Sequence, residues 1–349
     1  MKFFFSKTLG VCLLALTFLL GGCGRKEALQ FTAVDTAMGT VIQQNIYTVR
    51  EGEYTDKIQN IILELEEGTL TWRLPTSELY GVNQSAGREE SVELSRELSQ
   101  ILEQCFEISQ DTEGAFDVTI GSVARIWDID SWASGARIGE FQMPDSSELE
   151  LALERCGFQR VELQLQEDGK TAYISLDEGV SLDLGAIGKG LALDRIREYL
   201  TAEASVTGAV VSVGGSILTY GEKPDGTPWR VGIMDPLNTS RNLGVLTMTG
   251  SWCVSTSGDY ERYVESNGVR YHHILDPSTG YPVDNELTSV TVVTDQGMLS
   301  DALSTACFVL GRERGLILAQ QYGVEALFVE KDGSIAMTPG MGELFHRTP

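Results

Sequence analysis

The chain has 349 residues, and its 26 lysines and arginines against 50 aspartates and glutamates give a formal net charge of −24 at pH 7. This composition argues against a nucleic-acid ligand, because phosphate contacts require clusters of lysine and arginine and none is visible. The length suffices for one large domain or two small ones. The six cysteines show no C-x-x-C spacing, so the usual zinc and dithiol patterns are excluded.

Residues 1–22 have the pattern of a secretory signal, with Lys2 and Lys7 ahead of an apolar run. The segment ends in Leu-Gly-Gly before Cys23, and this ending resembles the lipobox of bacterial lipoproteins. The resemblance implies cleavage before Cys23 and acylation of that cysteine. The protein would then be lipid-anchored on the extracytoplasmic face of the bacterial cell membrane, which is the periplasmic side in a Gram-negative cell. The alternative is an uncleaved membrane anchor.

After the signal, hydrophobic periodicity predicts strands and separate helices. A strand begins at Phe31 and is interrupted at Gly39, and an amphipathic helix follows with an apolar stripe over residues 58–65. A second amphipathic helix is expected over residues 95–112. Residues 128–147 have an irregular pattern. The tryptophan at 132, inside this stretch, and the tryptophan at 127, next to it, either form a lid or only fill the surface.

Residues 158–180 alternate as in a β-hairpin with its turn at residues 167–169. Residues 209–220 form a strand broken by two glycines, further strands follow to residue 293, and a helix begins near Asp301. Long antiparallel strands with separate helices predict the α+β class, with no second membrane span.

Residues 180–200 combine a predicted strand, a turn with glycines at 185, 188 and 190, and a predicted helix. Backbone N–H groups and the helix N-terminus at such a turn can bind phosphate, Lys189 adds a positive charge, and Asp183 would face the same crevice. The alternative is that the glycines only permit tight packing. Their order, G-x-x-G-x-G, matches neither the dinucleotide fingerprint nor the P-loop.

Two further motifs carry residues with possible chemistry. In GAFDVTIG, residues 114–121, Phe116 can stack on a flat ring and Asp117 is a carboxylate beside a glycine turn, although a core phenylalanine with a turn aspartate is the commoner explanation of such a motif. In YHHILDP, residues 271–277, two histidines are adjacent, and successive strand residues point to opposite faces. For His273 a catalytic role and a structural role are both open.

The segment SDALSTA, residues 300–306, places Asp301 and Thr305 four residues apart, so their oxygens share one helix face. A carboxylate and a hydroxyl suit a hard cation such as Mg²⁺, which takes oxygen ligands and keeps waters. The alternative is a helix N-terminus capped by Ser300 with an aspartate in its first turn.

Taken together, these motifs resemble those of the ApbE family, the FAD:protein FMN transferases. The resemblance runs in order from Met38 to Gly311 and covers nearly the whole chain after Cys23. Its landmarks are AMGT, TWRLPTSELYGVN, GAFDVTIG, SLDLGAIGKG, VSVGGSI, HHILDPSTGYPV and SDALSTACFVLG. It implies one ApbE-like domain over residues 23–349, with T-fold-like antiparallel sheets, packed helices and FAD in a cleft between two halves.

The resemblance also implies roles for individual residues. The residues expected to line the FAD site are Met38, Trp72, Ala115, Phe116, Asp117, Asp183, Lys189 and Leu275. Magnesium would be held by the backbone oxygen of Ala186 with Asp301 and Thr305, while Ser304 stands where some relatives carry an acidic residue. Trp72 replaces a frequent tyrosine, which preserves stacking and loses a phenol. Ser216 stands where aspartate or asparagine is usual, and no role follows for it.

The implied reaction is a Mg²⁺-dependent transfer of the FMN moiety of FAD to a threonine hydroxyl of an acceptor protein, with release of AMP. His273 is the candidate general base, because imidazole titrates near neutrality. The acceptors implied are flavoprotein subunits of membrane redox complexes or extracytoplasmic reductases. The alternatives are a Mg²⁺-dependent FAD pyrophosphatase and a non-catalytic flavin-binding lipoprotein. The disulfide state of Cys105, Cys156, Cys253 and Cys307 stays open.

Overall fold

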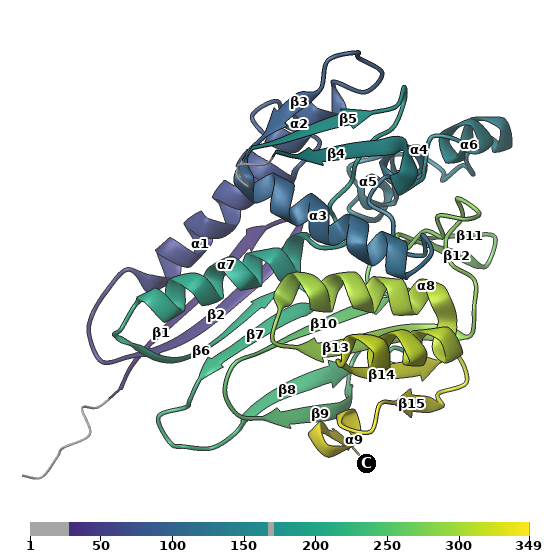
Figure 1. The fold of residues 1–349 in the computed structure, drawn as a ribbon. Coiled ribbons are helices and arrows are strands. Elements are labelled where there is room, and N and C mark those ends of the chain that lie inside the picture. Colours follow the sequence, from purple (N-terminus) through teal and green to yellow (C-terminus); the bar gives the residue numbers. More distant parts are fainter. Residues whose placement is uncertain (1–27, 167–170, 349) are drawn as a thin grey trace, which may run out of the picture.

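The computed structural model describes residues 28–166 and 171–348. Its centre is an eight-stranded sheet with the strand order β1-β2-β6-β7-β10-β13-β14-β15, in which every neighbouring pair is antiparallel (Figure 1). The predicted α+β class is confirmed. The strands are β1 (Leu29–Ala37), β2 (Thr40–Thr48), β6 (Val206–Val213), β7 (Ser216–Gly221), β10 (Trp252–Gly258), β13 (Leu287–Thr294), β14 (Glu325–Glu330) and β15 (Ile335–Met337).

Smaller sheets surround the large one. The β4–β5 pair is the hairpin predicted over residues 158–180, although its expected turn at 167–169 lies outside the described residues. The sheets, in strand order, are β3 (Val92–Leu94), β5 (Ala172–Leu176) and β4 (Val161–Leu165); β16 (Phe345–Arg347), β9 (Asn242–Met248) and β8 (Trp229–Met234); and the hairpin β11 (Tyr263–Ser266) with β12 (Val269–His272).

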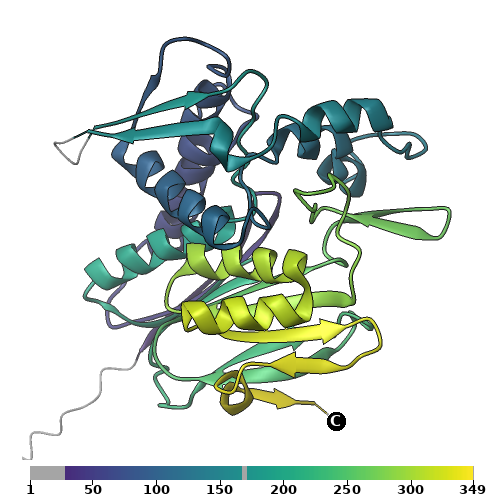
Figure 2. The ribbon, with the colours of Figure 1, turned by 45° about the vertical axis from the view of Figure 1, so that its right-hand side comes forward.

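Figures 1 and 2 show α1, α7 and α8 along one face of the large sheet and β8 and β9 against the other. The central strands are therefore buried on both faces, and all eight residues of β13 are buried, whereas β1 and β2 keep exposed residues. The helices predicted around 58–65 and 95–112 are α1 and α3. The helices are α1 (Tyr54–Leu65), continued by a π-helical turn (Glu66–Leu70), α2 (Glu78–Asn83), α3 (Arg96–Asp111), α4 (Gly121–Trp127), α5 (Ile129–Ala133), α6 (Ser146–Leu153), α7 (Gly188–Ala202), α8 (Gly297–Tyr322) and α9 (Met341–Leu344), with a 3₁₀ turn at Phe158–Arg160.

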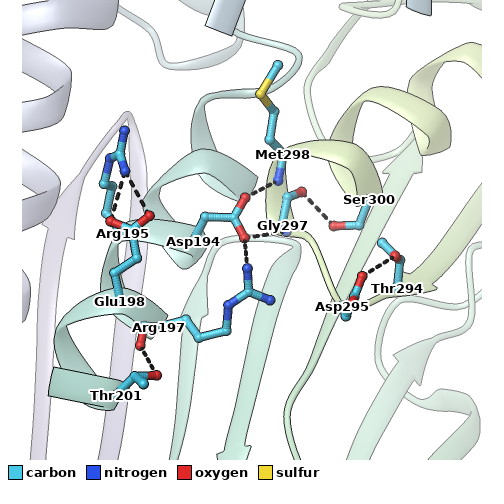
Figure 3. A network of polar contacts seen from close by, with 10 residues as sticks. All are labelled: Asp194, Arg195, Arg197, Glu198, Thr201, Thr294, Asp295, Gly297, Met298 and Ser300. Atoms are coloured by element: carbon cyan, nitrogen blue, oxygen red, sulfur yellow. Dashed lines mark hydrogen bonds and ion pairs between the residues drawn. The ribbon is translucent and has the colours of Figure 1, made fainter. Parts of the chain in front are cut away.

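Helices α7 and α8 cross at two glycines. A Cβ on Gly190 would lie 2.0 Å from the Gly297 carbonyl oxygen, and a Cβ on Gly297 would lie 2.1 Å from the Gly190 oxygen. The carboxylate of Asp194 in α7 accepts the N–H groups of Gly297 and Met298, each at 2.8 Å, and so caps α8 from outside (Figure 3). The helix predicted near Asp301 is α8, which begins four residues earlier, at Gly297. Its external cap is Asp194 rather than Ser300, the cap that the sequence left as an alternative.

The prediction of a strand at the start of residues 180–200 was wrong. Residues 180–184 are an extended segment with one isolated bridge, between Ser181 and Ile120. The side chain of Asn83 takes the place of a neighbouring strand, since its Oδ1 accepts the Leu182 N–H at 2.7 Å and its Nδ2 donates to the Leu182 carbonyl at 2.9 Å. The following helix, α7, is present as predicted.

The expected irregular stretch at 128–147 contains the short helix α5. Trp127 is fully buried, and its indole N–H donates to the Gly280 carbonyl at 2.7 Å. It contacts Phe141 and Tyr271, which join this region to the β11–β12 hairpin. Trp127 is therefore a core residue rather than a lid.

Four cysteines fall within the described ranges, and all are free thiols; Cys105, Cys253 and Cys307 are buried and Cys156 is half-buried. Within the same ranges, no helix has the length and apolar character needed to cross a membrane.

The glycine contact predicts that Gly190→Ala destabilises the protein by about 2–3 kcal/mol, because the new methyl meets a backbone oxygen that cannot move without separating the helices. Helix propensity alone would favour alanine by about 1 kcal/mol. The matched control is Gly81→Ala in α2, where a Cβ meets nothing within 4 Å. Urea unfolding measures both variants, and equal stability of the two would contradict the argument.

Candidate active site

One cleft brings together most of the site residues that the sequence predicts. It encloses about 1170 Å³ of non-protein space, part of it open to solvent. Its walls come from the loop before α7, the first turns of α7 and α8, the end of β10 with the following loop, the α4–α5 region and residues 273–277. Segments far apart in sequence therefore meet at one site.

The structure places almost all of the predicted site residues in this cleft. Those that line it are Trp72, Ala115, Phe116, Asp117, Asp183, Ala186, Lys189, His273, Leu275, Asp301 and Thr305. Met38 is not among the lining residues: its backbone, with φ at 51°, donates its N–H to Glu66 Oε2 at 2.7 Å, and its side chain packs against the main core. Cys23 lies outside the described residues.

Asp301 is held in a fixed orientation near the N-terminus of α8. Its Oδ2 accepts the Gly190 N–H and its Oδ1 accepts the Ser216 hydroxyl, both at 2.6 Å. The residue is 4% exposed, and none of the described lysines, arginines or histidines lies within 4.0 Å of its carboxylate. The carboxylate does not accept N–H groups of its own helix, so its partners come from other elements, α7 and β7.

The oxygens around Asp301 fit a hard cation. Thr305 lies one turn further along α8 and Ala186 lies in the loop before α7, and both line the cleft. Within the described ranges, no three His, Cys, Asp or Glu side chains are grouped to hold a metal. A carboxylate, a hydroxyl and a backbone carbonyl match the oxygen preference of Mg²⁺, which is usually bound by few protein groups together with waters and substrate phosphates.

Lys189 follows Ala186 by three residues and lies in the first turn of α7. It is half-buried, lines the cleft, and has no carboxylate of the described residues within 4.0 Å. The N-cap residue, Ile187, has no side-chain acceptor for the first N–H groups of the helix. An anion in the cleft would therefore meet both a free ammonium group and the positive end of a helix dipole.

Two aspartates shape the walls of the cleft. Asp183 Oδ1 accepts the Gly185 N–H at 2.8 Å and closes the turn before α7. Asp117 accepts from both the N–H and the hydroxyl of Thr119 and from the N–H of Phe158. Burial raises the pKa of Asp117, and these hydrogen bonds oppose the rise. Both oxygens of Asp117 thus organise the loop, although the residue lines the cleft.

An aromatic and charged cluster lies at Trp72. The guanidinium carbons of Arg73 and Arg125 lie 4.1 and 4.5 Å from the centre of the indole ring system. Asp130 forms ion pairs with Arg73 at 3.5 Å and with Arg262 at 2.7 Å. Trp72 thus offers a flat surface beside fixed positive charges.

His273 follows β12 and faces the cleft in a neutral form. Burial, followed by the charges of Arg262 and Lys189, holds the pKa of His273 well below its ordinary value. Its Nδ1 lies 3.2 Å from the Arg262 carbonyl oxygen. Because a carbonyl can only accept, Nδ1 carries the hydrogen of this contact, and Nε2 is left with a lone pair. His272 instead bonds within the core, through Val283 and Ile274.

Sequence reasoning missed several residues of the cleft. Glu261, Arg262 and Ser257 all come from the end of β10 and the loop after it. Burial raises the pKa of Glu261, and the charges of Lys189 and Arg262 oppose the rise. The only signal in the sequence is the run of polar residues STSGDYER at 255–262, which has the composition of an ordinary loop.

The similarity to known proteins covers nearly all of the chain. The model of the ApbE family matches residues 38–328. The FAD:protein FMN transferase of Treponema pallidum is 33% identical over 337 residues, covering 92% of this chain and 91% of that protein. The protein of the same name from Klebsiella pneumoniae is 35% identical over 306 residues, covering 86% and 89%.

Solved structures agree with the sequence comparisons. The ApbE protein of Thermotoga maritima is 29% identical with a TM-score of 0.77, covering 90% of this chain and 99% of its own. The apo flavinyl transferase ApbE of Pseudomonas stutzeri is 28% identical with a TM-score of 0.76, covering 92% and 98%. Because the family model matches residues 38–328 and the fold agrees with these solved structures over nearly the whole length, this chain belongs to the ApbE family.

Proposed function

We propose that this protein is a Mg²⁺-dependent FAD:protein FMN transferase, which moves the FMN moiety of FAD to a threonine hydroxyl of an acceptor protein and releases AMP. One observation carries the proposal: Lys189, the N-terminus of α7 and the oxygens of Asp301, Thr305 and Ala186 lie in the same cleft. This arrangement suits a pyrophosphate and a cation bound together. The names of the relatives from Treponema pallidum and Klebsiella pneumoniae support the same reaction.

The walls of the cleft suit the two halves of FAD. Trp72, Phe116 and Leu275 provide aromatic and apolar surface for the ring systems. Lys189 and the N–H groups at the start of α7 other than that of Gly190, which Asp301 accepts, would attract the anionic pyrophosphate. Mg²⁺ bound by Asp301, Thr305 and the Ala186 carbonyl would neutralise negative charge on the phosphates.

In the proposed reaction the threonine oxygen of the acceptor attacks the phosphorus of the FMN half. A phosphorus–oxygen bond forms to the threonine, the bond from that phosphorus to the bridging oxygen breaks, and AMP leaves with the electron pair. The hydroxyl proton passes to Nε2 of His273, which is neutral and has its lone pair free. His273 is therefore the proposed general base, with Nδ1 held by the Arg262 carbonyl.

We also propose that the protein works outside the cytoplasm as a lipoprotein, and that its acceptors are flavoprotein subunits of membrane redox complexes or extracytoplasmic reductases. The signal pattern at 1–22 and Cys23 support this location. Cys23→Ser removes the cysteine on which both acylation and cleavage would depend, so the variant should carry no fatty-acid label, whereas the unsubstituted protein should carry it. Labelling of expressing cells with a traceable fatty acid tests this, and an unlabelled unsubstituted protein in the membrane fraction would argue for an uncleaved anchor.

The transferase assignment is tested with the full chain, FAD, Mg²⁺ and an acceptor flavoprotein, with the acceptor weighed by mass spectrometry. We expect a mass gain of FMN minus water that requires Mg²⁺, and a loss of about 100-fold or more in rate for Asp301→Asn. The matched control is Asp235→Asn, which removes another buried carboxylate, at 3% exposure and outside the residues that line the cleft. Release of FMN and AMP with an unmodified acceptor would favour the pyrophosphatase, and no turnover would favour a flavin carrier.

The state of His273 predicts the pH dependence. An ordinary histidine would be half protonated at pH 6.5, whereas His273, whose pKa is lowered well below that value, stays neutral there. The rate should therefore be level between about pH 6.5 and about pH 8 and fall only as the pH drops through the lowered pKa. Arg262→Gln removes a positive charge, so it should raise the pKa of His273 and start the loss of activity at higher pH.

His273→Ala should slow transfer by about 10²-fold or more with FAD affinity retained, and full activity of this variant would rule out His273 as the general base.

A further inference from the structure

Serine hydroxyls of β10 meet serine hydroxyls of α8 beneath the cleft. Ser255 and Ser257 point to the same face of the sheet, as residues two apart on a strand do. Ser255 Oγ lies 2.7 Å from Ser300 Oγ, and Ser257 Oγ lies 2.8 Å from Ser304 Oγ. All four side chains are buried, so these contacts are fixed parts of the structure.

The direction of these hydrogen bonds follows from counting hydrogens. Ser304 donates its hydroxyl hydrogen to the Asp301 carbonyl at 2.9 Å, and Ser300 donates to the Gly297 carbonyl at 2.7 Å. A hydroxyl has one hydrogen and two lone pairs. Ser304 must therefore accept from Ser257, and Ser300 must accept from Ser255.

This order decides what Thr305 offers to the cleft. Ser257 Oγ also lies 3.2 Å from Thr305 Oγ1, and its only hydrogen is already given to Ser304. Thr305 must then donate its own hydrogen to Ser257. The Thr305 oxygen, which lines the cleft, is left with its lone pairs free, as a cation ligand requires.

Ser216 fixes the orientation of Asp301, as Ser257 fixes that of Thr305. Its hydroxyl donates to Oδ1 at 2.6 Å while the Gly190 N–H donates to Oδ2, so the carboxylate cannot rotate without losing a hydrogen bond. Ser216 is fully buried at the first position of β7, and Ser255 of β10 is its register partner. Two neighbouring central strands of the sheet, β7 and β10, thus orient both side-chain oxygens.

We propose that Ser216 and Ser257 are positioning residues that prepare Asp301 and Thr305 to bind the cation. The inference rests on the proposed cation site but adds two residues outside its proposed ligands, of which Ser257 also lines the cleft. Hydrogen-bond partners of metal ligands fix ligand orientation, and their loss typically costs about 10–100-fold in metal affinity. Preorganised ligands need no rearrangement when the cation arrives.

The test compares Ser216→Ala and Ser257→Ala with Ser255→Ala. Ser255 provides a matched control, because it makes the same kind of buried hydroxyl contact between β10 and α8, to a serine outside the residues that line the cleft. Binding of Mn²⁺, an oxygen-preferring stand-in for Mg²⁺, is measured on the full chain by the loss of the free Mn²⁺ electron-spin signal, without FAD. Urea unfolding is measured on the same samples.

We expect the Mn²⁺ dissociation constant to rise by about 10–100-fold in Ser216→Ala and in Ser257→Ala and to stay within about twofold in Ser255→Ala, with similar urea midpoints for all three. An equal rise in all three variants would show that the hydroxyls are only structural, and no rise in the first two would also overturn the proposal. FMN transfer by the unsubstituted protein distinguishes failure of the positioning role from failure of the proposed function. If the unsubstituted protein transfers FMN while the Mn²⁺ affinities of the variants are unchanged, only the positioning role fails. If the unsubstituted protein neither transfers FMN nor binds Mn²⁺, the proposed function itself is overturned.

Discussion

The close approach of α7 and α8 at Gly190 and Gly297 is the contact on which the site depends. It brings the backbone of each helix within reach of a carboxylate on the other, so that Asp194 caps α8 and Asp301 accepts the N–H of Gly190. The loop before α7 and the first turns of α8 then face one another. The Ala186 carbonyl, Lys189 and Asp301 share one cleft because two glycines leave room for this crossing.

The large sheet supports this helix pair with polar groups as well as apolar ones. Its central strands are buried on both faces, so a polar side chain inside them must find a partner. Ser216, Ser255 and Ser257 find partners on α8, and the sheet thereby fixes the rotation of that helix. The same hydrogen bonds that satisfy a buried interface also direct the lone pairs of Thr305, which links stability to the proposed chemistry.

Charge in the cleft is mixed rather than simply positive. The chain as a whole has a formal charge of −24, and the residues that line the cleft include six carboxylates beside Lys189, Arg73 and Arg262. Arg73 and Arg262 pair with Asp130, whereas Lys189 has no carboxylate of the described residues within 4.0 Å. The cleft would therefore attract a pyrophosphate through Lys189, the dipole of α7 and a bound cation, rather than through an overall positive charge.

Patterns local in sequence determined much of this protein. Periodicity predicted α1, α3 and α7 and the β4–β5 hairpin, because amphipathic spacing depends only on which face of an element is buried. The ordered motifs identified the family and eleven of the residues that line the cleft, whereas Glu261, Arg262 and Ser257 were missed. The roles assigned to these residues stay predictions. Met38, which the motif placed at the FAD site, packs against the core and is not among the lining residues.

Only the tertiary structure decided the interactions between distant segments. The extended segment at Leu182 finds its partner in the Asn83 side chain, 99 residues earlier, rather than in a strand. The start of α8 is set by Asp194, and Asp301 is oriented by Ser216, 85 residues away. The sequence contains these residues, but a hydrogen bond across such distances leaves no periodic trace. It exists only once the glycine contact and the sheet have brought its donor and acceptor together.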